Sequence, residues 1–452
     1  MKVVPFIHEG LGNSSYLIEV APGQVVLVDP DRSVDRYLAA AEELDLHVVG
    51  IFETHLHADF VTGSVEARAA TGATVFLPAE ASPGFPHRGL NAGELVQVGE
   101  VEVEAIASPG HTPEHLSYVF RHESPPLLFS GGSLIVGGAA RTDLIDPSMT
   151  DALTRAQHRT LHRAFRKLPD DTVLMPTHGG GSFCSSGQGG SRTSTLGDER
   201  RTNALLRIDN EDDFASWFPT TFPAVPRYFT RMRAVNRSGP RLRRDIPPPP
   251  ALVPDAFEKM IADGALVVDV RPFESFARAH VPGALSDPFR PAFAVWLGWL
   301  AHEGSRLAFV VDERVSLTDV GDEALLVGQE NFAGWLEGGM EAWEVSGRPI
   351  ARLELVGPKE ARTLLADEAL ALDVREPDEF ARGHVPSALN VPVGEIEARA
   401  GEIPRGVPVV AYCGHGERSS SALSILERLG FGPLYNLDGG FGAWKEVERG
   451  VH

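Results

Sequence analysis

The chain contains only two cysteines, Cys184 and Cys413, and the residues around the second predict a nucleophile. A strand-like apolar segment, residues 407–412, runs directly into Cys413, and a helix-like segment covers residues 420–430. Backbone N–H groups of a short glycine-containing loop, together with the N-terminus of the next helix, favour a thiolate over a thiol. An arginine in the loop adds a cation for an anionic substrate. The candidate loop consists of Cys413, Gly414, His415, Gly416, Glu417, Arg418 and Ser419.

Three histidine clusters in the first half of the chain predict a metal site. The first has the pattern His-x-His-x-Asp, the second follows Ser-Pro-Gly and the third follows Pro-Thr. Several imidazoles with a carboxylate at strand ends are the ligand set of a divalent metal ion. The candidate ligands are His55, His57, Asp59, His111 and His178, and Cys184, six residues further on, is a candidate second thiol near the metal.

The composition argues against several classes of partner. A formal net charge of −21 repels phosphate backbones and anionic lipids, so we expect no nucleic-acid or membrane partner. The sequence contains no apolar run of about 18 residues, and it begins without the apolar region of a signal peptide. Two cysteines cannot build a disulfide framework and fit a reducing compartment. We therefore expect a cytoplasmic protein whose cysteines are free thiols.

An internal repeat organises the second half of the 452-residue chain. Residues 266–285 recur as 370–389 at an offset of 104, and residues 337–343 recur as 438–444 at an offset of 101. Four consecutive prolines, 247–250, fit neither a helix interior nor a central strand and mark a boundary. Strand-like segments that alternate with helix-like ones indicate α/β domains. The predicted domains are 1–245, 251–350 and 355–452.

The two copies of the repeat differ at the nucleophile. At the offset of 101 the position of Cys413 is occupied by Asp312, and residues 255–350 contain no cysteine. The first copy therefore lacks the nucleophile, and we interpret it as a packing or docking module.

The second copy resembles the rhodanese family. The matching features are the Asp-Val-Arg strand, the His-Val-Pro turn, the Cys-to-Arg loop and the closing Gly-Gly-x-x-Ala-Trp. The resemblance implies that Cys413 accepts a sulfane sulfur as a persulfide, which the loop N–H groups bind. The donor would be thiosulfate or a small thiol persulfide such as glutathione persulfide. A related phosphatase family has a loop one residue longer, so the four residues between Cys413 and Arg418 favour sulfur over phosphate.

The histidine clusters resemble those of the metallo-β-lactamase superfamily, which implies an αββα sandwich, and Asp29 also matches. Together with the tandem rhodanese copies, they make the whole chain similar to the bacterial persulfide dioxygenase–rhodanese fusions of sulfide detoxification. In that family two histidines and one aspartate hold one Fe(II), which serves the oxidation of a persulfide to sulfite. The resemblance implies that the two histidines here are His55 and His111.

Two residues depart from the family pattern. Phe60 stands where a binuclear hydrolase has a histidine of the second metal site, which is compatible with a single metal. Gly132 stands where the family has the aspartate ligand, and glycine has no side chain to bind a metal. A site of imidazoles without that carboxylate should bind Fe(II) more weakly and could prefer Zn²⁺. An intact fold with an empty site is the alternative.

Three functions follow from this sequence. The first is a bifunctional enzyme that combines sulfur transfer at Cys413 with persulfide dioxygenase chemistry at a degenerate mononuclear site. The second is a sulfurtransferase or sulfur carrier whose metallo-β-lactamase domain only binds a thiol or a partner. The third is a thioester hydrolase of the glyoxalase II type, against which Phe60 and Gly132 both argue. The tail of the first domain and the inactive copy could also serve an interface in a homo-oligomer.

Overall fold

A computed structural model describes residues 1–122, 125–185 and 190–449, and the chain forms two compact units. Unit 1 comprises Met1–Ile246 with Leu325–Gly328, and unit 2 comprises the rest. The division at residue 247 falls on the run of four prolines, whose fixed φ angles suit an extended connection. The bounds of the three domains stay predictions, and residues 450–452 lie outside the described part of the chain.

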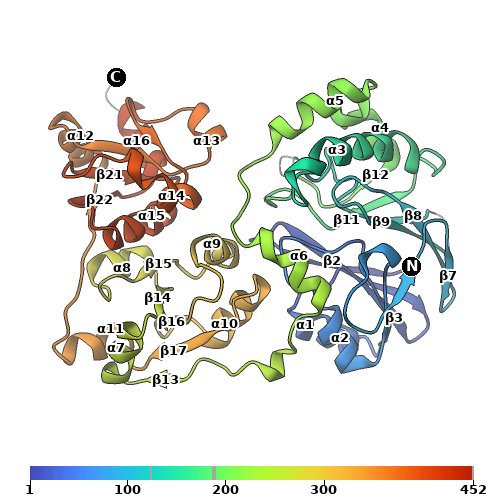
Figure 1. Ribbon diagram of the computed structural model, residues 1–452, viewed down its shortest axis with the longest axis horizontal. Coiled ribbons are helices and arrows are strands. Elements are labelled where there is room, and N and C mark those ends of the chain that lie inside the picture. The colour runs from blue at the N-terminus through green and yellow to red at the C-terminus, as the bar shows by residue number, and fades with distance from the viewer. Residues whose placement is uncertain (123–124, 186–189, 450–452) are drawn as a thin grey trace. The chain divides into compact units, whose positions relative to one another are not determined.

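Unit 1 contains two six-stranded sheets, with strand orders β1-β2-β3-β4-β5-β6 and β12-β11-β10-β9-β8-β7 (Figure 1). The strands of the first sheet are β1 (Val3–His8), β2 (Asn13–Ala21), β3 (Gln24–Val28), β4 (His47–Phe52), β5 (Thr74–Pro78) and β6 (Arg88–Leu90). Those of the second are β7 (Leu95–Val98), β8 (Val101–Ala107), β9 (Leu116–Arg121), β10 (Leu127–Gly131), β11 (Val173–Pro176) and β12 (Ser194–Thr195).

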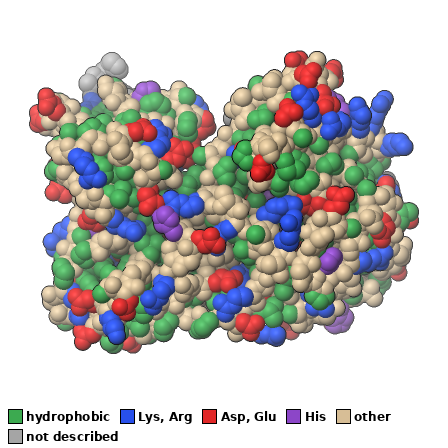
Figure 2. Space-filling model, viewed as in Figure 1, with side chains coloured by type: hydrophobic (Ala, Val, Ile, Leu, Met, Phe, Trp, Pro, Cys, Tyr) green, Lys and Arg blue, Asp and Glu red, His purple; other side chains and the backbone are tan. Residues whose placement is uncertain are grey.

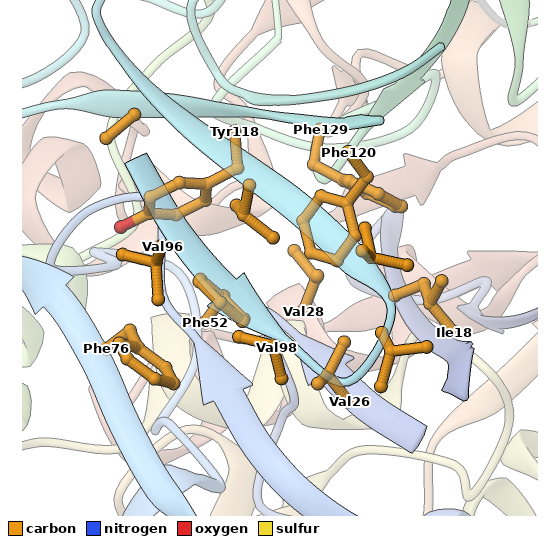
Figure 3. Close-up of a cluster of buried hydrophobic side chains, with 14 of the residues drawn as sticks. Ile18, Val26, Val28, Phe52, Phe76, Val96, Val98, Tyr118, Phe120 and Phe129 are labelled. Carbon is orange, nitrogen blue, oxygen red and sulfur yellow. The ribbon is translucent and has the colours of Figure 1, made fainter. Parts of the chain in front are cut away.

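The two sheets pack face to face through a buried apolar layer. Side chains alternate along each strand, so every second residue points between the sheets. Phe52 stacks on Phe76 at a centroid distance of 4.5 Å and meets Tyr118 and Phe120 of the opposite sheet edge-on. Figure 3 shows these rings together with Ile18, Val26, Val28, Val96, Val98 and Phe129.

Helices cover the outer faces of the sandwich. The outer side of the first sheet packs against α1 and α2 through Leu27, Ile51 and Tyr37. The second sheet packs against the segment from α3 to α5 through Leu128, Phe165 and similar residues. This arrangement confirms the predicted αββα sandwich. The helices of unit 1 are α1 (Val34–Glu43), α2 (Ser64–Thr71), α3 (Thr150–Arg159), α4 (Leu196–Thr202), α5 (Glu211–Trp217) and α6 (Phe229–Ser238).

Unit 2 contains two five-stranded parallel sheets with equivalent orders, β13-β17-β16-β14-β15 and β18-β22-β21-β19-β20. The strands of the first copy are β13 (Ala251–Leu252), β14 (Leu266–Asp269), β15 (Leu285–Ser286), β16 (Leu307–Val310) and β17 (Phe332–Leu336). Those of the second are β18 (Glu354–Val356), β19 (Leu370–Asp373), β20 (Leu389–Asn390), β21 (Val409–Tyr412) and β22 (Leu434–Leu437).

The sequence repeat is also a repeat of side-chain contacts. The Arg271 guanidinium donates hydrogen bonds to the carboxylate of Asp269 at 2.6–3.2 Å and to a backbone carbonyl at 2.8 Å. Arg375 makes the same bonds to Asp373 and to a backbone carbonyl at the same distances. Such buried bidentate pairs fix the end of the strand against the next helix. The helices of unit 2 are α7 (Pro254–Ala262), α8 (Phe273–Arg278), α9 (Phe293–Leu300), α10 (Leu317–Leu326), α11 (Gly339–Val345), α12 (Pro358–Ala366), α13 (Pro377–Ala381), α14 (Ile396–Arg399), α15 (Glu417–Arg428) and α16 (Gly440–Arg449).

Two surface properties bear on partners. Within the described residues, the helices are too short or too polar to cross a membrane. On the face shown in Figure 2, acidic and basic side chains are interspersed over the surface.

Candidate functional site

The predicted metal ligands converge at the edge of the sandwich where several strands end. His55 and His57 follow β4, His111 follows β8 and His178 follows β11. All four side chains are buried. The candidate ligand atoms of His55, His57 and His178 lie within 4.8 Å of one another, as do those of His111, His178 and Cys184. The fold therefore brings together residues that are up to 129 positions apart in the sequence.

Hydrogen bonds orient two of the imidazole rings so that Nε2 keeps a free lone pair. The Nδ1 atom of His55 lies 2.9 Å from Oγ1 of Thr54, whose hydroxyl donates to Asp29 at 2.8 Å. The Nδ1 atom of His111 donates to the carbonyl of Arg141 at 2.6 Å. Nε2 of His111 is buried and has no hydrogen-bond partner among the described residues. Outer partners of this kind fix the tautomer of metal-binding histidines.

Burial and crowding keep these imidazoles neutral. Burial first, and then the nearby His178, lower the pKa of His111 to about 3. Burial and the neighbouring histidines also hold the pKa of His55 well below its ordinary value. A cluster of neutral imidazoles, each with a lone pair, fits a divalent metal ion.

His57 has a different environment. Its Nε2 atom lies 3.3 Å from Asp29 and 3.2 Å from Glu53, and its ring stacks on Phe60 at 4.3 Å. Burial alone would lower the pKa of His57, but the two carboxylates raise it to about 10. A protonated ring carries no free lone pair. These contacts favour one metal, because they engage His57 and fill the position of a second-site histidine with Phe60. Sequence reasoning missed Glu53, which no local motif indicates.

Asp59 lies beside the Nδ1 atom of His178. Its Oδ2 atom is 3.2 Å from Nδ1 of His178 and accepts from the amide of Asn13 at 2.8 Å. Nε2 of His178 lies 3.4 Å from Nε2 of His55, as two ligands of one ion would. Nδ1 of His178 also lies 3.2 Å from Oδ1 of Asn13, so Asp59 and Asn13 together can orient this metal-binding histidine. Sequence reasoning missed Asn13, which lies at the start of β2.

Gly132 lies at the cluster, and neighbouring side chains occupy the space that a side chain at this position would need. An ideal Cβ at this position would be 2.7 Å from Cδ2 of His111, 3.0 Å from Cδ2 of His178 and 2.9 Å from Cβ of Ala140. The backbone N–H of Gly132 donates to Nε2 of His115 at 3.1 Å. The residues present thus fit a divalent metal but supply no carboxylate from position 132.

Cys184 is fully buried beside the histidines. Burial first, and then the neighbouring Asp59, hold the pKa of its thiol well above the ordinary value. The thiol is therefore shielded from solvent reagents and faces the candidate metal centre.

The second site is built at the carboxyl end of β21. Cys413 directly follows this strand and is buried, and the backbone N–H of Gly416 donates to its Sγ at 3.1 Å. The hydroxyl oxygen of Ser419 lies 3.6 Å from the same sulfur. A Cβ at Gly440 would meet the backbone of Gly414 and the carbonyl of Cys413 at 2.6 Å. The second Gly-Gly-x-x-Ala-Trp motif thus lets α16 pack directly on the nucleophile loop.

The helix after the loop begins earlier than the sequence suggested. Glu417, Arg418 and Ser419 form the first turn of α15, so the loop itself is Cys413 to Gly416, and His415 is exposed at its tip. Both terminal nitrogens of Arg418 bond to Glu379, at 2.6 and 2.9 Å.

An acidic residue that sequence reasoning missed lies near this arginine. Burial raises the pKa of Glu376 to about 7, against the opposing effect of Arg418. Glu376 and Glu379 surround the guanidinium with carboxyl groups at the mouth of the loop, although their distance along the chain gave no indication of this.

The equivalent loop of the first copy has no nucleophile. Asp312 accepts hydrogen bonds from the backbone and side chain of Arg314, at 2.9 and 2.8 Å. The first copy instead contributes Phe273, whose ring would be only 2.7 Å from a Cβ placed on Gly416. One wall of the Cys413 loop therefore comes from the copy without a cysteine.

Comparisons with known proteins agree with this architecture. Residues 8–178 match the metallo-beta-lactamase superfamily, and residues 253–346 and 357–447 each match the rhodanese-like domain. A hydroxyacylglutathione hydrolase of Polaromonas sp. is 31% identical over 170 residues, which are 37% of this chain and 62% of that protein. The mitochondrial persulfide dioxygenase ETHE1 of Homo sapiens is 27% identical over 190 residues, which are 42% of this chain and 69% of that protein.

A solved structure extends the likeness beyond the first domain. A metallo-beta-lactamase from Staphylococcus aureus is 25% identical with a TM-score of 0.66, and the match covers 74% of this chain and 98% of that one. The chain thus joins a metallo-β-lactamase superfamily domain, with relatives among the persulfide dioxygenases, to two rhodanese-like domains.

Proposed function

We propose that this chain transfers sulfane sulfur through a persulfide on Cys413. Rhodanese-like domains make it a sulfurtransferase-type enzyme of sulfur metabolism. The hydrogen bond from Gly416 N–H to Cys413 Sγ at 3.1 Å is the observation that carries the proposal, because it stabilises negative charge on sulfur. The cation of Arg418 beside the loop supports an anionic or polarised donor such as thiosulfate or a thiol persulfide.

The transfer needs no redox partner. The Cys413 thiolate attacks the sulfane sulfur of thiosulfate, the S–S bond breaks, and sulfite leaves with the electron pair. An acceptor nucleophile then attacks the outer sulfur of the persulfide, and the Cys413 thiolate is regenerated. The loop N–H groups hold the negative charge before and after each step.

We further propose that the first domain acts on a thiol persulfide at a mononuclear metal centre. A bound divalent metal, Fe(II) by the family resemblance or Zn²⁺, would supply the Lewis-acid or redox chemistry of this centre. His55, His111 and His178 would hold it, while Asp59 and Thr54 orient their rings. The similarity to a persulfide dioxygenase supports this assignment.

Two other functions compete for the first domain. A thioester hydrolase is suggested by the relatives named hydroxyacylglutathione hydrolase. The stacking of Phe60 on His57 and the pairing of His57 with two carboxylates disfavour the second metal that such an enzyme would use. A non-catalytic scaffold that only binds a thiol or a partner is favoured by Gly132.

The cysteine proposal is tested by thiosulfate:cyanide sulfurtransferase assays on matched single variants. Cys413→Ser should abolish thiocyanate formation, whereas Cys184→Ser should retain most of it. Equal loss in both variants would show that the nucleophile is misassigned.

The first domain is tested by oxygen uptake of anaerobically Fe(II)-loaded protein with glutathione persulfide. Uptake that tracks bound iron and yields sulfite supports the dioxygenase. Sulfur transfer without uptake supports the scaffold, and absorbance-monitored hydrolysis of a glutathione thioester would support the hydrolase.

A further inference from the structure

The histidine cluster lacks the carboxylate ligand that position 132 would supply. Gly132 supplies no carboxylate, and the Asp59 carboxylate lies 3.2 Å from Nδ1 of His178, which also lies within hydrogen-bond distance of Oδ1 of Asn13. Yet Nε2 of His111 is buried without a hydrogen-bond partner among the described residues. A buried ring nitrogen with no partner is costly unless it meets an ion or a water molecule.

Cys184 lies close to His111 and to His178, and its thiol can become an anionic ligand when a metal binds. The candidate ligand atoms of His111, His178 and Cys184 all lie within 4.8 Å of one another, a spacing that ligands around one ion can have. The side chain of Cys184 is fully buried, as are both histidines. Two imidazoles and a thiolate make an N₂S donor set.

One short backbone segment holds these groups in place. The N–H of Arg141 donates to the carbonyl of Cys184 at 2.8 Å, and the carbonyl of Arg141 accepts from Nδ1 of His111 at 2.6 Å. The preceding residue, Ala140, donates to the carbonyl of Gly132 at 2.9 Å. The peptide groups of Ala140 and Arg141 therefore fix His111, Cys184 and position 132 relative to one another, so the fold itself holds the two prospective ligands close together.

We propose that Cys184 replaces the missing carboxylate as a ligand of the metal, together with His111 and His178. On binding, a metal–sulfur bond replaces the S–H bond and one proton passes to solvent, without any change in oxidation state. The thiolate restores the single negative charge that an aspartate would contribute, but as a soft donor. A site with a thiolate ligand suits Zn²⁺ and similar ions, whereas a site with a carboxylate supplies a harder ligand.

Cobalt(II) titration of the full chain tests the proposal, because a thiolate bound to Co²⁺ gives a sulfur-to-metal charge-transfer band in the near ultraviolet. The wild type and Cys413→Ser should both show this band, and Cys184→Ser should lose it. With only two cysteines in the chain, Cys413→Ser is a matched control. Co²⁺ binding without the band, persistence of the band in Cys184→Ser, or failure to bind Co²⁺ would each overturn the proposal.

A second measurement gives the ligand distance and affinity. X-ray absorption of the Zn²⁺-loaded wild type should show one sulfur neighbour at about 2.3 Å with nitrogen neighbours at about 2.0–2.1 Å. Zn²⁺ affinity should fall in Cys184→Ser by more than the roughly 10–100-fold that loss of an outer hydrogen-bond partner costs. That variant should retain most of its sulfur transfer at Cys413 and keep the circular dichroism spectrum of the wild type, which distinguishes loss of a ligand from loss of the fold. A zinc shell of nitrogen and oxygen alone would refute the proposal.

Discussion

Replacing Gly132 by aspartate tests whether the carboxylate can be put back, and the structure predicts that the single substitution is strained. The new Cβ would lie 2.7 Å from His111, 2.9 Å from Ala140 and 3.0 Å from His178. These contacts are shorter than van der Waals distances, and overpacking in a buried site costs about 1–3 kcal/mol. Without metal the buried carboxylate also lacks the water that solvates it. We therefore expect metal-free Gly132→Asp to lose at least about 1–3 kcal/mol of unfolding free energy.

The double variant Gly132→Asp/Ala140→Gly removes one of the three contacts and should recover part of this loss. With the aspartate accommodated, Fe(II) should bind more tightly than in the wild type. A tenfold gain in affinity appears as about 1.4 kcal/mol of added stability at saturating metal.

Anaerobic denaturant unfolding with and without Fe(II) measures both effects. A metal-free single variant as stable as the wild type would show that position 132 is not packed as described. Absence of an iron-dependent gain in the double variant would show that this position does not face the metal.

Three other perturbations probe the remaining groups. Gly416→Ala places a methyl group 2.7 Å from Phe273 at φ +132° and displaces the donor to the nucleophilic sulfur. Sulfur transfer should fall roughly 10–100-fold, the equivalent of about 1.5–3 kcal/mol. A second substitution, Phe273→Ala, should restore part of the rate. If it does not, the new methyl group and the Phe273 ring do not clash. Arg418→Gln should raise the KM for thiosulfate more than it lowers kcat in steady-state assays, and an unchanged KM would contradict a role in binding the donor. Burial opposes the charge of His57, but the two neighbouring carboxylates raise the pKa of His57 to about 10. Protonated His57 therefore stabilises the fold fully below about pH 6.5, and this stabilisation is lost as the pH rises through 10. The metal-free protein should lose stability over that range in denaturant titrations, His57→Gln should lose less, and parallel profiles would count against the assignment.

Much of the architecture could be predicted because its signals are local. The repeat at offsets of 104 and 101 predicted two equivalent sheets, and the identical Asp-Arg pairs of the two copies follow from it. Strand-like segments that run into His55 and Cys413 placed both at strand ends. In each case the residues that determine the structural feature lie together in a short stretch of sequence.

The contacts that set the chemistry could not be predicted, because they join residues distant in sequence. Nothing near Glu53 indicates that it pairs with His57 rather than solvent, and nothing near Asn13 indicates that it orients Asp59. The approach of Cys184 to His111 depends on a backbone link through Arg141 that only the folded chain shows. Sequence reasoning gave the inventory of reactive groups, but packing decides which of them face one another.

The two positions where the chain departs from a catalytic pattern have different structural consequences. Next to Gly132, Nε2 of His111 is buried without a hydrogen-bond partner among the described residues, and a thiol lies nearby, so the site keeps groups that can hold a metal. At Asp312 the carboxylate bonds to Arg314 of its own loop, and residues 255–350 contain no cysteine.

The first copy nevertheless supports the reactive helix of the second. The N–H of Ser286 donates to Ser424 at 3.0 Å, the hydroxyls of Ser286 and Ser420 lie 2.8 Å apart, and His280 meets Glu427 at 3.0 Å. These contacts run along α15, whose first turn carries Arg418. The first copy, which has no cysteine, therefore contributes structural contacts to the second. Substitutions at Ser286 should accordingly affect sulfur transfer at Cys413 through the position of α15, even though Ser286 lies in the copy that has no nucleophile.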